Sequence, residues 1–243
     1  MATRSTHVSI LVVDIEGYGR RPNPIQASLR TAMYDVVRGA VADCHLPWDE
    51  FTALDRGDGI LLLVPPATSP VDLAGPLIRA LDEGLTEKAR MFSAAHAMRL
   101  RVALHAGLVE EDTHGWVGEA INTTARLVDA QPLRDTLAAA SRAHLAFIVS
   151  DEIYRGIIRH EYRFIDASTF RPVRLSLKEL DTTAWVHVPG YPAPPGLPPA
   201  QTAPPPKGPE PEPPVVASTH IHGDQVFGDK FIGNKNVYGA GPA

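Results

Sequence analysis

Polar residues of the kinds used in phosphoryl transfer occur on three separated stretches of this sequence. Asp14 ends an apolar run, and Asp58 lies just before a second one. Two carboxylates at strand ends can hold a divalent cation, because Mg²⁺ and similar ions prefer oxygen ligands. Asn122 and Arg126 are four residues apart, so on a helix they share a face and can aim donors at one charged oxygen. The combination indicates nucleotide chemistry, although each residue alone also fits a turn or a solvated helix face.

Hydrophobic periodicity predicts the elements that must position these residues. Strands are predicted over residues 8–13, 51–54, 60–64, 100–109, 145–149, 175–177 and 184–188. Helices are predicted from Pro24 to Val41, from Ser69 to Leu85, from Gly118 to Val128 and after Ser150. Because hairpins alternate with helical crossovers, we expect an α+β sandwich with a mostly antiparallel sheet and helices on one face.

Composition divides the chain into three parts. The 243 residues are 44% hydrophobic, which suffices for a sizeable core. Thirteen of the 23 prolines fall between Pro189 and Pro214. Such a segment cannot pack, and it is expected to be a disordered, semi-rigid spacer reaching about 80 Å. The predicted parts are therefore a globular domain (1–189), a Pro-rich linker (190–216) and a short tail (217–243).

Charge and cysteine content exclude several classes of function. The net charge of −5 gives no basic surface for a nucleic acid partner. The single cysteine, Cys44, suits a reducing compartment, and no apolar run approaches the roughly 18 to 20 residues that cross a bilayer. His96, His105 and His114 are not at zinc-ligand spacing. We expect a cytoplasmic protein with no membrane partner and no zinc site.

Four motifs, in order, resemble those of the class III nucleotidyl cyclases, the adenylate/guanylate cyclase catalytic domain. They are the stretches 12–18, 57–58, 101–107 and 118–126, and the likeness spans about residues 8–188. The resemblance implies a ferredoxin-like sandwich of the cyclase type. It also implies conversion of a nucleoside triphosphate to a 3′,5′-cyclic nucleotide and pyrophosphate, in sites at a homodimer interface.

The resemblance assigns roles to individual positions. Asp14 and Asp58 match the carboxylates that hold two Mg²⁺ or Mn²⁺ ions, and Ile15 would lend its carbonyl. Asn122 and Arg126 match the pair that orients the ribose and stabilises the transition state. In the family the carboxylate pair and the Asn/Arg pair of one site come from opposite chains.

One further position is a weaker match, and two positions depart from the family pattern. Lys178 matches a late lysine that contacts the phosphates. At the two positions that read the base in adenylate cyclases of this family, the polar residues are replaced by Leu54 and Gly115. Selection of adenine by that pair is therefore not expected. The alternative function is an inactive dimerising, nucleotide-binding module whose output is the tail.

The tail carries a short repeat. Glycines at 223, 228 and 233 are each followed by Asp or Asn, and apolar pairs recur between them. Such a segment buries no core alone, but copies can stack with amide ladders and a dry seam. It is similar to the motifs of bacterial amyloid signalling proteins, which implies a receptor bearing a matching motif. The alternative is a disordered tail.

We predict that a peptide of residues 217–239 forms fibrils that bind thioflavin, because its apolar pairs are ordered only in a stack. Fluorescence with and without seeds of the same peptide measures this. A peptide that stays monomeric at high concentration, even when seeded, contradicts the prediction.

Overall fold

The computed structural model of the chain describes residues 5–177 and 180–197. Its strands are β1 (Thr6–Ile15), β2 (Thr52–Asp55), β3 (Gly59–Val64), β4 (Leu100–Asp112), β5 (Gly115–Val117), β6 (Leu145–Ser150), β7 (Arg171–Leu177) and β8 (Leu180–His187). Its helices are α1 (Asn23–Asp43), α2 (Pro70–Ala74), α3 (Pro76–Met91), α4 (Glu119–Val128), α5 (Gln131–Ala139) and α6 (Asp151–Gly156). Short 3₁₀ segments are η1 (Tyr18–Arg20), η2 (Trp48–Glu50), η3 (Ala94–His96), η4 (Ile158–His160) and η5 (Ala167–Thr169).

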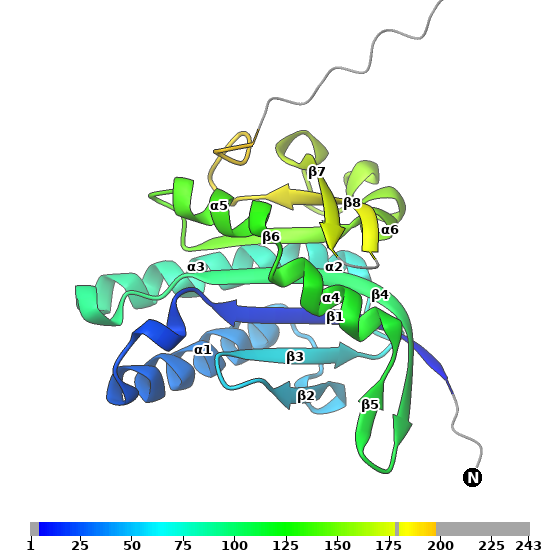
Figure 1. Cartoon of the computed structure of the whole chain (residues 1–243), viewed down its shortest axis with the longest axis horizontal. Helices are drawn as coiled ribbons and strands as arrows, with labels where there is room; N and C mark the ends of the chain where they lie inside the picture. The colour runs from blue at the N-terminus through cyan, green and yellow to red at the C-terminus, as the bar shows by residue number, and fades with distance from the viewer. Residues whose placement is uncertain (1–4, 178–179, 198–243) are drawn as a thin grey trace, which may run out of the picture. The chain divides into compact units, whose positions relative to one another are not determined.

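The strands form one sheet in the order β2-β3-β1-β4-β6-β8-β7, and β5 pairs with the far end of β4 (Figure 1). Every described pairing is antiparallel except that of β4 with β6. The α+β class with a mostly antiparallel sheet is therefore confirmed. β1 lies between β3 and β4, so both of its neighbours lie far from it in the sequence.

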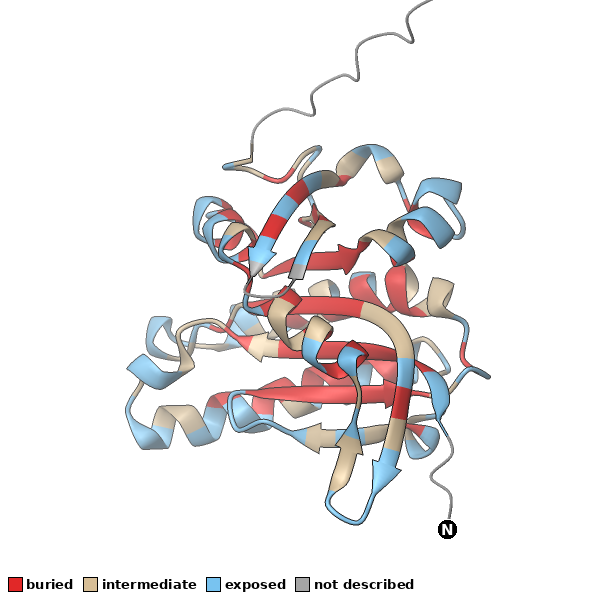
Figure 2. Cartoon of the chain, turned by 45° about the vertical axis from the view of Figure 1, so that its right-hand side comes forward, coloured by how far each residue is buried: buried red, intermediate tan, exposed pale blue. Residues whose placement is uncertain are grey.

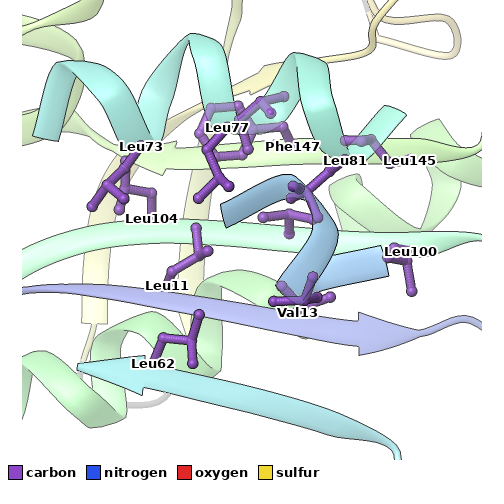
Figure 3. Packing of buried hydrophobic residues seen from close by; sticks show 14 of the residues in the cluster. Leu11, Val13, Leu62, Leu73, Leu77, Leu81, Leu100, Leu104, Leu145 and Phe147 are labelled. Atoms are coloured by element: carbon purple, nitrogen blue, oxygen red, sulfur yellow. The ribbon is translucent and has the colours of Figure 1, made fainter. Parts of the chain in front are cut away.

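Helices cover both faces of the sheet, and the expectation of one covered face was wrong. Leu11 and Val13 of β1 pack in a core with α1, α2 and α3, while Ile10 and Val12 pack in a second core with α4 and α5. Figure 3 shows leucines of α3 meeting strand residues in the first core. Runs of buried residues without alternation belong to strands covered on both sides, and the sequence of β1 has that pattern.

Two local features differ from the sequence prediction. The helix expected from Ser69 to Leu85 is split into α2 and α3 at Gly75. Pro76 lacks a backbone donor and disfavours helical geometry at the residue before it, which explains the break. The predicted cap is confirmed, since Ser69 Oγ accepts a hydrogen bond from the Val71 amide at 3.3 Å. The short β5 and α5 were not predicted.

Burial is concentrated in the middle of the sheet, where the strands are covered along their length, whereas the β4–β5 hairpin is largely exposed (Figure 2). On this hairpin, Val117 is 49% exposed, and nearby Leu108 is 60% exposed. Among the described residues, no helix is both long and apolar enough to cross a membrane. Lys178, most of the predicted linker and the whole predicted tail lie outside the described residues.

His187, at the end of β8, is held in its neutral form. Its ring stacks on Phe170 with the centroids 4.8 Å apart, and its Nδ1 lies 2.9 Å from Thr169 Oγ1. Burial lowers the pKa of His187 from 6.5 to about 4, because the surroundings penalise the charged ring more than Asp166 favours it. Between pH 4 and 6.5 the unfolded chain therefore binds more protons at this site than the folded chain, so stability falls as the pH falls.

We predict that acidification from pH 7 to pH 4.5 costs the wild type about 2 kcal/mol more than a His187→Phe variant, which keeps a ring but no titrating group. Urea unfolding of both proteins at both pH values gives this difference directly. Other titrating groups are common to the two proteins and cancel. Equal losses in both would show that His187 is not buried as a neutral ring.

Candidate active site

The structure brings Asp14 and Asp58 to the same edge of the sheet. Asp14 lies near the end of β1 and pairs in register with Gly59, the first residue of β3. The Ile15 amide donates a hydrogen bond to the Asp58 carbonyl at 2.9 Å. The two aspartates therefore lie on adjacent backbones.

The close approach of β3 to β1 requires glycine at position 59. A Cβ atom there would lie 2.4 Å from the Val13 carbonyl oxygen. The preceding turn is set by Gly57, whose φ of +82° is left-handed, and by its amide, which donates to Asp55 Oδ1 at 2.7 Å. The turn formed by residues 56–59 thus fixes the position of Asp58 just before β3.

Asp14 is largely buried and paired with Arg101 of β4. Its side chain is 13% exposed, and Arg101 donates from Nε at 2.9 Å and from Nη2 to the same oxygen, Oδ2. Burial raises the pKa of Asp14 to about 6, although Arg101 opposes the rise. The nearby charges of Asp58 and Asp129 make smaller contributions to the same rise. The site therefore holds several carboxylates close enough to repel one another.

A second ion pair lies beside the first. Arg99 donates from Nε to Glu16 Oε2 at 2.7 Å and from Nη2 to Oε1 at 2.9 Å. The backbone continues the pairing, since the Glu16 amide donates to the Arg99 carbonyl at 2.9 Å. At the end of the β1–β4 ladder, the two acidic residues on the β1 side thus face the two arginines on the β4 side.

The sequence analysis missed Arg99 and Arg101. The pattern that indicates them is an alternation of charged and apolar residues, which occurs in residues 14–16 at one strand end and in residues 99–101 at another. Alternate residues of a strand share a face, so complementary charges at period two can pair across an antiparallel ladder. The pattern could be read only once β1 and β4 were known to be neighbours.

Glu16, Asp58, Arg99 and Arg101 border a cleft of about 840 Å³, here named the β1 cleft. Its walls are the turn after β1, the end of the β3 turn, the start of β4 and one side of α5. Guanidinium groups dominate its polar lining. The lining residues are 15–21, Asp58, Arg99, Arg101, Gln131, Arg134, Asp135 and Ala138.

Asn122 and Arg126 lie on α4, outside the β1 cleft. The buried side of α4 carries Ala120, Ile121, Thr124, Leu127 and Val128. Asn122 is exposed and Arg126 is half-buried, and neither has a side-chain hydrogen bond within the described part of the chain. α4 sits close against β4 because Gly107 faces Ala120, where a Cβ would approach to 2.6 Å. Neither Asn122 nor Arg126 therefore lines the cleft that Asp58 borders.

The base-reading positions also lie outside the β1 cleft. Leu54, on β2, is half-buried against the second core. Gly115, at the start of β5, has φ of +130°, and a Cβ there would meet no atom within 4 Å. Both positions are thus apolar in this structure, while Lys178 lies outside the described residues.

The donor set at the sheet edge is suited to a hard cation. Among residues 5–177 and 180–197, no group of three or more His, Cys, Asp or Glu side chains is arranged to hold a metal ion. Asp14 and Asp58, however, are close enough for Asp58 to raise the pKa of Asp14. Both hydrogen bonds from Arg101 go to Oδ2 of Asp14 and leave Oδ1 to other partners. Two mutually repelling carboxylates beside a backbone carbonyl fit Mg²⁺ or Mn²⁺.

We predict that Gly59→Ala lowers the free energy of unfolding by about 2 kcal/mol, because the new methyl group overlaps the Val13 carbonyl. Gly39→Ala is the matched control. Gly39 lies within α1 with open space around it, so the same substitution there should stabilise the protein by about 0.5 to 1 kcal/mol. Chemical denaturation of the three proteins compares them. A Gly59→Ala protein as stable as the wild type would show that β3 does not approach β1 this closely.

Comparison with known proteins identifies the fold. No family model matches the sequence, and a search of curated proteins finds no significant match. Solved structures do match. An adenylate/guanylate cyclase/hydrolase from Silicibacter pomeroyi is 16% identical with a TM-score of 0.56, and the match covers 77% of this chain and 99% of that chain.

Two further structures agree. The adenylyl cyclase CyaB from P. aeruginosa is 14% identical with a TM-score of 0.54, covering 77% of this chain and 96% of that one. The guanylyl cyclase Cya2 is 14% identical with a TM-score of 0.52, covering 77% and 93%. The chain therefore has the fold of adenylyl and guanylyl cyclase domains.

Proposed function

We propose that this protein is a nucleotidyl cyclase that converts a nucleoside triphosphate to a 3′,5′-cyclic nucleotide and pyrophosphate. The observation that carries the proposal is the closeness of Asp14 and Asp58 at one edge of the sheet, in a cyclase fold, where Asp58 and Ile15 line an arginine-rich cleft. In the reaction, the 3′-hydroxyl oxygen bonds to the α-phosphorus and the bond to the pyrophosphate oxygen breaks. The hydroxyl proton passes to water.

The β1 cleft supplies positive charge for the triphosphate. Arg101 and Arg134 line it, together with the two arginines that end the turn after β1. Arg99 also lines it, but its donors are taken by Glu16 and by carbonyls at the end of α5. Guanidinium groups bind phosphate oxygens through two parallel hydrogen bonds. Arg101, which donates to Asp14 in this structure, can turn its donors to a phosphate when Asp14 takes up a cation.

Asp14 and Asp58, with the Ile15 carbonyl, would hold two Mg²⁺ or Mn²⁺ ions. Such ions lower the pKa of a bound hydroxyl and neutralise a leaving pyrophosphate. The burial of Asp14 favours this role, because a buried carboxylate gains most from a cation that compensates its charge. Asp58 is exposed on its turn and can approach the same ions without rearranging the core.

The other half of each site would come from a second chain. Asn122 and Arg126 lie on the exposed side of α4 rather than in the β1 cleft. In a homodimer, α4 of the partner subunit would cover the cleft. Asn122 would then orient the ribose, and Arg126 would stabilise the charge that develops on the α-phosphate.

The base would meet little polar recognition. Leu54 and Gly115 offer no side-chain hydrogen bond, so discrimination would rest on shape and backbone contacts. We propose Lys178 as a phosphate contact and the tail as a self-assembly motif that meets a receptor with a matching motif. These last two assignments rest on the sequence, since both segments lie outside the described residues.

We predict that the purified protein with Mn²⁺ forms a cyclic product from at least one of ATP, GTP, CTP and UTP, detected by mass spectrometry. Asp58→Asn should lower the rate by about a hundredfold or more, because the amide cannot compensate a cation's charge. Its fold should be retained, since Asp58 is exposed. No product from any of the four nucleotides, in protein shown to be dimeric, would overturn the proposal.

A mixing experiment tests the shared site. Asp58→Asn and Arg126→Ala should each be inactive alone and partly active when mixed, because a mixed dimer contains one site with neither substitution. A mixture of Asn122→Ala with Arg126→Ala is the matched control. It should stay inactive, since both substitutions remove residues from the same half, and every site in a mixed dimer carries one of them.

A further inference from the structure

We propose that Arg99 is a positioning residue that fixes the turn after β1 against α5 and so sets the width of the β1 cleft. The inference rests on the proposed function for its catalytic consequence. The contacts that support it are independent of that function. They join three segments that are far apart in the sequence.

Arg99 uses its whole guanidinium group. Nε and Nη2 bind the two carboxylate oxygens of Glu16 at 2.7 and 2.9 Å. Nη1 donates to the Leu137 carbonyl at 2.9 Å and to the Ala140 carbonyl at 3.4 Å. One side chain therefore holds the residue that follows β1 and the C-terminal end of α5.

The chemistry of these contacts requires arginine. A planar guanidinium offers a rigid fork to a carboxylate and still has donors for other acceptors, whereas an ammonium group is a single point charge. Carbonyls at the C-terminal end of a helix also favour a cation, because their dipoles add there. A lysine at position 99 would keep the charge but could not span both acceptor sets in this geometry.

The position of Glu16 links this clamp to the cleft. Glu16 is two residues from Asp14, and the turn from Gly17 to Arg21 forms one wall of the cleft. Gln131, Arg134, Asp135 and Ala138 of α5 form another part of its lining. Because Arg99 binds both sides, releasing it would let the two walls move apart.

Loss of the Arg99 contacts should change the geometry of the β1 cleft more than the free energy of unfolding. The side chains of Arg99 and Glu16 are 28% and 31% exposed. Ion pairs with this access to water contribute modestly to folding. A phosphate site depends on the placement of its groups, and small misplacements weaken binding and slow catalysis strongly.

The test uses full-length Arg99→Met and Arg99→Lys with two readouts besides activity. Hydrogen exchange measures protection of the amides in residues 16–21, and calorimetry measures binding of inorganic tripolyphosphate with Mn²⁺. We expect faster exchange and about tenfold weaker binding in both variants, because neither can form the fork. Melting temperatures should change little.

Arg134→Met is the matched control. Arg134 lines the same cleft but pairs with Asp129 at 2.6 Å rather than with the turn. It should weaken tripolyphosphate binding through lost charge while leaving exchange of residues 16–21 at the wild-type rate. If both variants bind tripolyphosphate more weakly but only the Arg99 variant shows faster exchange in residues 16–21, then Arg99 positions the turn and does not act by its charge alone.

The two proposals fail in different ways. Wild-type protein that binds no tripolyphosphate would overturn the proposed function, and exchange in the Arg99 variants would still decide whether the clamp exists. Wild-type exchange rates in Arg99→Met would overturn the clamp. Wild-type protection and affinity in Arg99→Lys would show that charge alone suffices and would also overturn the proposal.

Discussion

The antiparallel pairing of β1 with β4 is the constraint on which the rest of the structure depends. Its register places Asp14 opposite Arg101, and the next pair on the same face joins Glu16 to Arg99. A slip of one residue would exchange the two faces of β1. It would move two carboxylates into the α1–α3 core and the three apolar side chains of Leu11, Val13 and Ile15 out of it. The register of this one strand pair thus specifies both the core and the polar edge of the sheet.

The charges at this edge are stable only as a group. Asp14 is too buried to be solvated well, and its pKa of about 6 shows that Arg101 compensates only part of the cost. Asp58 and Asp129 add repulsion instead of relief. A site that is acidic, buried and incompletely neutralised gains free energy from an added cation. Under the proposed function, the burial and repulsion that raise the pKa of Asp14 would also give the site its affinity for a metal ion.

The sequence predicted most elements because each depends on local patterns. Apolar runs mark β1 and β3, Gly57 and Gly59 mark the turn that carries Asp58, and Ser69 marks a cap. Contacts between distant segments were beyond such patterns. The pairing of Arg99 and Arg101 with the carboxylates could be recognised only from the register with β1, and the position of α4 and α5 on the second face only from the cores. The resemblance to a known family pointed to the aspartates and to the Asn/Arg pair. It did not indicate which contacts hold the turn after β1.

The separation of Asp58 from Asn122 and Arg126 has a consequence for control of the proposed activity. If a second chain completes the site, the fraction of complete sites follows the fraction of chains that are dimeric. The rate of product formation then depends on the local concentration of chains and not only on the amount of protein. Tethering or clustering raises the effective concentration of a partner without any new contact at the site. A self-assembling tail on a spacer of about 80 Å would act in this way. Under the proposed function, such a tail would not need to touch the β1 cleft to regulate it, because bringing two chains together would complete the site.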